Sequence, residues 1–300
     1  MTTPFTSGAK IKWGIRVPLS VLKDLRKIYS GLNADEVRVA STRELRVGLL
    51  ATSDGVFRDM EDFLIPPHWG YQRRAETLRM LTRLDAPAEG FDFFLCEPGV
   101  GLPRKGYMFD YSGAATELVK AVVSDNQDVE LALARTFPAF REAVAHAIVT
   151  RISRENAIMA LMTALPNVIP SIVELPWAVG EFATDTAFLT MNQIRMALMM
   201  AAVHDRPIGY GEQKTSIATI AAGAFGWRAI ARELVGKIPL GGGLIPKAAI
   251  AYAGTWVVGT GLDRLYRTGV GLSRRERLEA WDGAIEKGRH VASEIGNAGN

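Results

Sequence analysis

The 300-residue sequence has one cysteine and four histidines, which limits its chemistry. A single cysteine, Cys96, excludes an internal disulfide and is typical of proteins in a reducing cytoplasm. The histidines form no His-x-x-x-His or Glu-x-x-His pair, so the sequence predicts no zinc site. It contains no Gly-x-Ser-x-Gly motif and no Cys–His arrangement, and it therefore offers no nucleophile for covalent hydrolysis.

The sequence also lacks a strong charge imbalance. A net charge of +3 is too small over this length to predict nucleic-acid binding. Residues 1–8 have no charged region leading into an apolar core, so we expect no signal peptide. Hydrophobic residues make up 48% of the chain and the mean hydropathy is +0.08, both high for a soluble protein, whereas the charged fraction of 22% is ordinary. The excess of apolar residues must therefore be local.

The most apolar part of the chain, residues 181–266, predicts three helices. The first, over 181–203, ends in a stretch that is apolar on every face and must be buried in protein or lipid. Its upstream part carries polar residues along one side, and the second helix, over 215–237, carries two arginines one turn apart. We expect ion pairs between these helices that fix their register; the alternative is a proton path, an ion path or a ligand site. The candidate polar cluster comprises Glu181, Asp185, Asn192, Gln193, Arg195, Arg228, Arg232 and Lys247.

No segment is long enough for a clear membrane span. The uncharged run over 248–262 has 15 residues, which reach about 22 Å at about 1.5 Å per residue. A span needs roughly 20 apolar residues for a core of about 30 Å. The other candidate, 156–173, contains Pro166 and Pro170, each of which removes a helical hydrogen bond. A helical hairpin that lies in the interface or inserts partway fits better than a true span.

Residues 9–30 alternate basic and apolar groups. This pattern predicts either a membrane-surface anchor that meets anionic lipid or a solvated helix that packs on its own protein. Pro18 divides the segment, and a helix is expected to start there.

Two apolar runs, over 45–51 and 91–96, predict buried strands. A turn at 52–55 and a helix through Phe63 follow the first run, which is the start of an α/β unit. Arginines between 73 and 83 predict a helix with a solvated basic face. Residues 129–154 predict amphipathic helix broken at Pro138, and 273–288 predict a surface helix followed by a disordered end.

Residues 156–269 resemble the helical domain of unknown function found at the C-terminus of many bacterial GTPases and in YcjF-like inner-membrane proteins. The resemblance implies a helical module associated with membranes or GTPases, with no established chemistry. The residues that carry it are Leu165-Pro166, Ile169-Pro170, Asp185, Leu189, Asn192-Gln193, Arg195, Trp227-Arg228-Ala229, Ala231-Arg232, Ile238-Pro239 and Ile245-Pro246-Lys247-Ala248-Ala249-Ile250.

Residues 40–101 resemble a GTPase core that has lost its nucleotide-binding residues. Aligned on the phosphate loop, Ala51 and Val56 replace the glycines, Phe57 the lysine and Arg58 the magnesium-binding hydroxyl residue. The segment Cys96-Glu97-Pro98-Gly99 resembles the switch sequence Asp-x-Pro-Gly, with Cys96 in place of the metal-binding acid and Gly99 retained. Magnesium needs hard oxygen ligands and the transferred phosphoryl needs a cation. We therefore expect no GTP hydrolysis, no nucleotide binding and no cofactor.

The sequence thus predicts an α+β fold, mostly α. The expected parts are a basic amphipathic segment (1–39), a degenerate α/β GTPase-like domain (40–128), a helical connector (129–155), an apolar helical domain (156–269), and a surface helix with a disordered tail (270–300). The predicted function is that of a non-enzymatic module at the inner face of the cell membrane, peripheral or partly inserted, whose partners are lipid and a GTPase or another protein, including a second copy. The alternatives are an active GTPase-like switch with atypical nucleotide contacts and a soluble subunit whose apolar helices pack on a partner.

Overall fold

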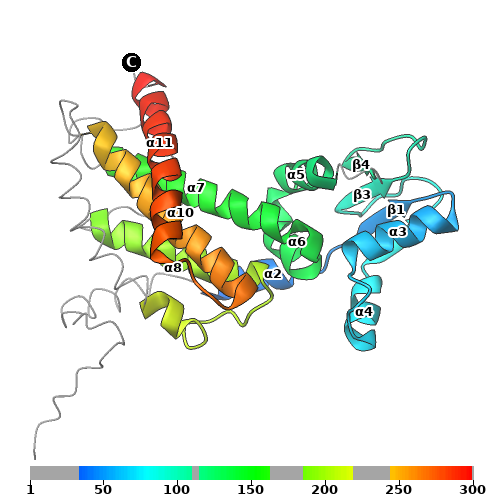
Figure 1. The fold of residues 1–300 in the computed structure, drawn as a ribbon. Coiled ribbons are helices and arrows are strands. Elements are labelled where there is room, and N and C mark those ends of the chain that lie inside the picture. Colours follow the sequence, from blue (N-terminus) through cyan, green and yellow to red (C-terminus); the bar gives the residue numbers. More distant parts are fainter. Residues whose placement is uncertain (1–33, 110–114, 163–184, 219–243, 299–300) are drawn as a thin grey trace, which may run out of the picture.

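The computed structural model describes residues 34–109, 115–162, 185–218 and 244–298, with a small sheet at one end and long helices at the other (Figure 1). The architecture is α+β and mostly helical, as predicted. In chain order the elements are α2 (Ala34–Thr42), β1 (Val47–Leu50), α3 (Asp54–Leu64), α4 (Tyr71–Leu78), β2 (Leu81–Leu84), β3 (Phe93–Cys96), β4 (Gly106–Met108), α5 (Ala115–Asp125), η1 (Gln127–Val129), α6 (Glu130–Thr136), η2 (Pro138–Phe140), α7 (Arg141–Met162), α8 (Asp185–Val203), α10 (Leu244–Thr268) and α11 (Arg274–Ala298).

The four strands pair in parallel in the order β2-β1-β3-β4. The two predicted strands, β1 and β3, are its central pair, and every residue of both is buried. Continuous apolar runs suit this position because a central parallel strand is covered on both faces. Val47 and Leu49 belong to the main core, whereas Leu50, Phe94 and Cys96 form a smaller cluster.

The prediction of a basic helix that extends to Arg83 is wrong for its second half. Helix α4 ends at Leu78, and Leu81–Leu84 form the edge strand β2, paired with β1. The central residues of β2, Thr82 and Arg83, are exposed. Because only the two leucines are partly buried, β2 has neither the apolar run of a central strand nor a long alternating pattern.

The break predicted at Pro138 is confirmed, and it lies at the centre of the protein. Helix α6 ends at Thr136, and α7 begins after the short turn η2. Phe140 in this turn has its ring 6.1 Å from that of Phe93 on β3, 6.1 Å from that of Phe63 on α3 and 6.5 Å from that of Phe137. One cluster of buried side chains therefore runs from the sheet through this turn into the long helices.

The long helices α7, α8 and α10 pack against one another, and α11 packs on α10 and α7. The last eight residues of α8, 196–203, are all buried, which agrees with the prediction that this helix is covered on every face. It is covered by protein, since α2, α6, α7 and α10 surround it. Within the described residues, no helix combines the length and the apolarity that crossing a membrane requires.

Helix α11 is more than the expected surface helix. Its Trp281, Ala284 and Ala292 are buried, and Gly288 lies against the backbone of α10. The helix begins with a capping box, in which the Glu276 carboxylate accepts from Ser273 N–H at 2.8 Å and the Ser273 hydroxyl oxygen accepts from Glu276 N–H at 3.3 Å. It continues to Ala298, so most of the end that was expected to be disordered is helical.

The packing of α11 on α10 requires a glycine at 288. A Cβ there would lie 2.8 Å from the Cα and 2.9 Å from the carbonyl oxygen of Ala249, and backbone atoms cannot move aside cheaply. We expect Gly288→Ala to lower the free energy of unfolding by about 1–3 kcal/mol, as overpacking does. Gly283→Ala is the matched control on the same helix, because a Cβ there meets nothing within 4 Å. The control should be neutral or stabilising by up to about 1 kcal/mol. Equal effects of the two variants in denaturant unfolding would contradict this packing.

Candidate functional site

The loop after β1 is the segment that the sequence comparison aligned with a GTPase phosphate loop. Ala51 is buried at the end of the strand, and α3 begins after the N-cap residue Ser53, whose side chain accepts from Val56 N–H at 3.2 Å. The Glu97 carboxylate, from the end of β3, accepts from Thr52 N–H at 2.5 Å, from the Thr52 hydroxyl at 2.7 Å and from Ser53 N–H at 3.4 Å. These bonds, the Thr52 hydroxyl foremost, hold the pKa of the Glu97 carboxyl below its usual range. The loop thus binds an anion supplied by the chain itself.

The other residues aligned with nucleotide-binding positions lie in different surroundings. Phe57 is partly buried, and the Arg83 Cζ lies over the Phe57 ring, 5.1 Å from the centre of that ring. Arg58 is exposed. Cys96 is buried, and burial raises the pKa of its thiol to about 11. Gly99 takes a φ of +95°, which suits glycine in the turn after β3. No group of three or more His, Cys, Asp and Glu side chains that could hold a metal occurs in the described residues.

Part of the predicted polar cluster forms a buried network between α7, α8 and α10. Asn192 donates to the Asn156 side-chain oxygen at 2.8 Å, and Asn156 donates to the Thr255 hydroxyl at 2.8 Å. Gln193 reaches the same hydroxyl at 3.4 Å. Because uncharged side chains bonded across three helices disfavour other registers, this network helps to fix how α7, α8 and α10 pack. Asn156 and Thr255 were not predicted as members.

Of the other predicted members, the structure describes Arg195, Lys247 and the backbone of Asp185. Arg195 lies 3.9 Å from Glu155 of α7, and burial raises the pKa of that carboxyl against the opposing effect of Arg195. Lys247 is partly buried in the first turn of α10. Asp185 is the first residue of α8. Glu181, Arg228 and Arg232 lie outside the described residues, so the expected pairing of acids with these arginines stays a prediction.

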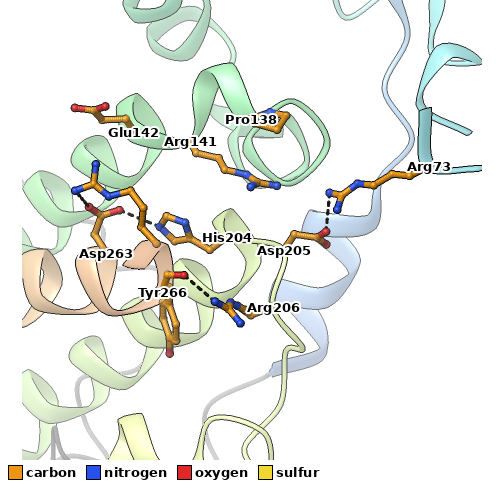
Figure 2. Close-up of a pocket in the computed structure, with 10 residues that line it drawn as sticks. Arg73, Pro138, Arg141, Glu142, His204, Asp205, Arg206, Asp263 and Tyr266 are labelled. Carbon is orange, nitrogen blue, oxygen red and sulfur yellow. Dashed lines mark hydrogen bonds and ion pairs between the residues drawn. The ribbon is translucent and has the colours of Figure 1, made fainter. Parts of the chain in front are cut away.

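A polar cavity of about 490 Å³ lies where the ends of three helices meet, and sequence reasoning missed it. Figure 2 shows its side chains converging from the start of α7, from the end of α8 and from the last turns of α10, with Arg73 reaching in from α4. The lining residues are Arg73, Pro138, Arg141, Glu142, His204, Asp205, Arg206, Asp263, Tyr266 and Arg267. They come from four separate stretches of sequence, so no local motif predicts that they lie together.

At this cavity, Asp205 at the end of α8 forms ion pairs with α4, beside the sheet, and with α6. Its carboxylate lies 2.8 Å from the Arg73 guanidinium of α4 and 3.2 Å from that of Arg135 on α6. It has a φ of 52° at the end of α8, where its N–H bonds to Ala202 O at 3.0 Å and Arg206 N–H bonds to Ala201 O at 2.7 Å. This is a Schellman helix end, a position usually taken by glycine. An aspartate here keeps a carboxylate at the expense of some backbone strain.

The second acid of the cavity is Asp263, near the end of α10. It bonds to His204 Nε2 at 2.9 Å and lies 4.0 Å from Arg267. Arg206 donates instead to the Tyr266 carbonyl oxygen at 2.9 Å, and the Tyr266 hydroxyl bonds to Gln213 and, at 3.0 Å, to Ser216. Burial raises the pKa of the Tyr266 hydroxyl. These bonds fix the orientation of the end of α10 against the loop that follows α8.

Comparison with protein families, with curated proteins and with solved structures finds no match to this chain. Any assignment of function therefore depends on the residues themselves.

The Arg73–Asp205 pair should be energetically coupled beyond an ordinary surface pair. In a double-mutant cycle of Arg73→Ala and Asp205→Asn, we expect a coupling of about 1 kcal/mol, because Asp205 is largely shielded while Arg73 is partly exposed. Asparagine tolerates the left-handed backbone, so this change removes mainly the charge. The control cycle is Arg275–Glu279, whose side chains are 89% and 60% exposed, with an expected coupling of at most about 0.5 kcal/mol. A coupling no larger than the control would show that Asp205 does not link the two ends.

Proposed function

We propose that the protein is a non-enzymatic binding module: a GTPase-like α/β unit that does not use nucleotide, joined to a helical domain that serves association. The observation that carries this proposal is the position of Glu97. A phosphate loop binds phosphate through free backbone N–H groups, whereas here the Thr52 and Ser53 N–H groups already bond to a carboxylate. A nucleotide phosphate would have to displace that carboxylate and be repelled by it.

The side chains around this loop also oppose phosphoryl transfer. Catalysis would need a cation beside the phosphates and an oxygen ligand for magnesium. Phe57 and the buried Cys96 thiol supply neither, and the nearby Arg83 lies 2.6 Å from Asp54 and over the Phe57 ring. Arg83 is therefore already engaged within the α/β unit.

Membrane association is the second part of the proposal. We assign the contact with lipid to the N-terminal segment, residues 9–30. The apolar faces of α8 and α10 are covered by other helices of the chain, so their hydrophobicity serves helix packing. The basic and apolar residues over 9–30 lie outside the described residues and have the composition of an interfacial anchor. The protein would then be cytoplasmic and peripheral at the inner face of the membrane.

The nucleotide claim predicts that titration of the intact protein with GTP and magnesium gives no saturable heat in the micromolar range beyond binding that inorganic triphosphate reproduces and Arg206→Ala removes. Inorganic triphosphate is titrated in parallel, because an arginine-rich cavity can bind phosphates without recognising guanine. Micromolar GTP affinity that persists in Arg206→Ala would contradict the proposal, since it would place the nucleotide away from the cavity. Affinity that disappears in Arg206→Ala would belong to the cavity and would leave the loop without nucleotide.

The membrane claim predicts co-flotation with vesicles of phosphatidylcholine and phosphatidylglycerol. Reversing three N-terminal charges, Lys23→Glu, Arg26→Glu and Lys27→Glu together, should weaken this binding at least tenfold, at about 1 kcal/mol per basic residue near an anionic surface. The matched control reverses three exposed arginines of α11, Arg274, Arg275 and Arg277, and should change binding much less. An intact protein that ignores these vesicles, or equal losses in both variants, would refute the claim.

A further inference from the structure

We propose that the cavity at the ends of α7, α8 and α10, lined by Arg141 and Arg206, binds a small anion that bears a phosphate group. This inference goes beyond the proposed function and does not depend on it, because the cavity shares no residue with the loop at Thr52 and Ser53.

The cavity has more positive charge than its own acids neutralise. Arg73, Arg141, Arg206 and Arg267 line it, and Arg135 lies beside it on Asp205. Asp205 is shared between Arg73 and Arg135, and Asp263 between His204 and Arg267. Both acids are therefore already paired. The third acid, Glu142, is exposed, and Figure 2 shows it pointing away from the Arg141 guanidinium.

Within the described part of the chain, Arg141 and Arg206 are the lining cations that hydrogen-bond to neutral carbonyl oxygens and form no ion pair within 4.0 Å, although Asp205 lies near enough to Arg141 to act on it electrostatically. Arg141 donates to the carbonyl oxygens of Ala134 at 3.1 Å and Arg135 at 3.4 Å. Arg206 donates to the carbonyl oxygen of Tyr266 at 2.9 Å. Since a guanidinium has five N–H donors, each retains several for a ligand.

The setting of Arg141 adds to this argument. Burial lowers the pKa of its guanidinium, Asp205 opposes that effect, and the charges of Arg73 and Arg135 lower the pKa further. The group stays protonated at neutral pH because arginine titrates far above it. A partly desolvated cation beside two others is a costly arrangement, and an anion placed among them would stabilise it.

Size and geometry select the class of ligand. A volume of about 490 Å³ falls within the roughly 300–1,000 Å³ typical of small-molecule sites. The planar fork of arginine matches the oxygens of phosphate in a bidentate fashion, and the carbonyls that hold Arg141 and Arg206 fix their direction in advance. A phosphate ester is therefore favoured, whether it comes from a soluble metabolite or from a phospholipid headgroup.

The test uses the intact protein with inorganic phosphate and pyrophosphate as soluble probes, in calorimetry and thermal unfolding. If the ligand is a soluble phosphate ester, both probes should bind saturably and raise the melting temperature. Arg206→Ala should weaken binding roughly tenfold or more, because it removes charge-assisted hydrogen bonds. The control Arg274→Ala removes an exposed arginine on α11 and should bind as the unchanged protein does. If Arg206→Ala does not fold, Arg206→Gln replaces it, since glutamine keeps a donor for the Tyr266 carbonyl.

A second arm separates the two sources of phosphate. It uses vesicles of phosphatidylcholine with phosphatidic acid, and a protein that already carries the three N-terminal charge reversals, so that the basic segment does not dominate. Soluble probes that bind, with loss in the Arg206 variant, support a metabolite site. Vesicle binding alone, with the same loss, supports a headgroup site. Binding of neither kind, or binding that is equal in the Arg206 and Arg274 variants, would overturn the proposal.

Discussion

The structure depends on one buried junction, the turn between α6 and α7. Proline at 138 ends one helix and lets the chain turn, and the rings of Phe137 and Phe140 fill the space between the sheet and the long helices. Both side chains are fully buried, and each large aromatic group buries apolar surface that would otherwise face water. Because the core continues without interruption from β3 to α10, the α/β unit and the helical bundle are parts of one packed body. The Arg73–Asp205–Arg135 ion pairs then fix the surface above this junction.

The loop after β1 and the cavity differ in whether their donor groups are already paired with the chain's own carboxylates. At the loop after β1, a carboxylate of the protein satisfies backbone N–H groups that could otherwise receive phosphate, and an occupied anion position needs no ligand. At the cavity, the carboxylates are paired and guanidinium groups remain in excess. The loop after β1 is thus satisfied by the chain's own carboxylate, whereas several arginines gather at the cavity.

Sequence reasoning succeeded where a local pattern determines the structure. The apolar runs of β1 and β3 and the break at Pro138 are such patterns, because burial on both faces and the missing proline N–H each act locally. It failed at β2, where Leu81–Leu84 is half exposed and continues the helical spacing of α4. It identified Asn192 and Gln193 as polar residues in an apolar helix but could not name Asn156 and Thr255, which lie far away in sequence. The cavity was missed for the same reason, and the role of Asp205 depends on ion pairs with Arg73 and Arg135 that are equally distant in sequence.

The central claim, that the sheet and the helices share one core, is tested most directly by hydrogen–deuterium exchange of the intact protein as a function of denaturant. If the core is continuous, the slowest amides of β1 and β3 and those of α7 and α10 will exchange through the same global opening, with equal free energies and equal denaturant dependence. Exchange of the strand amides through a separate opening of lower free energy, while α7 and α10 stay protected, would show two independent bodies and contradict the account.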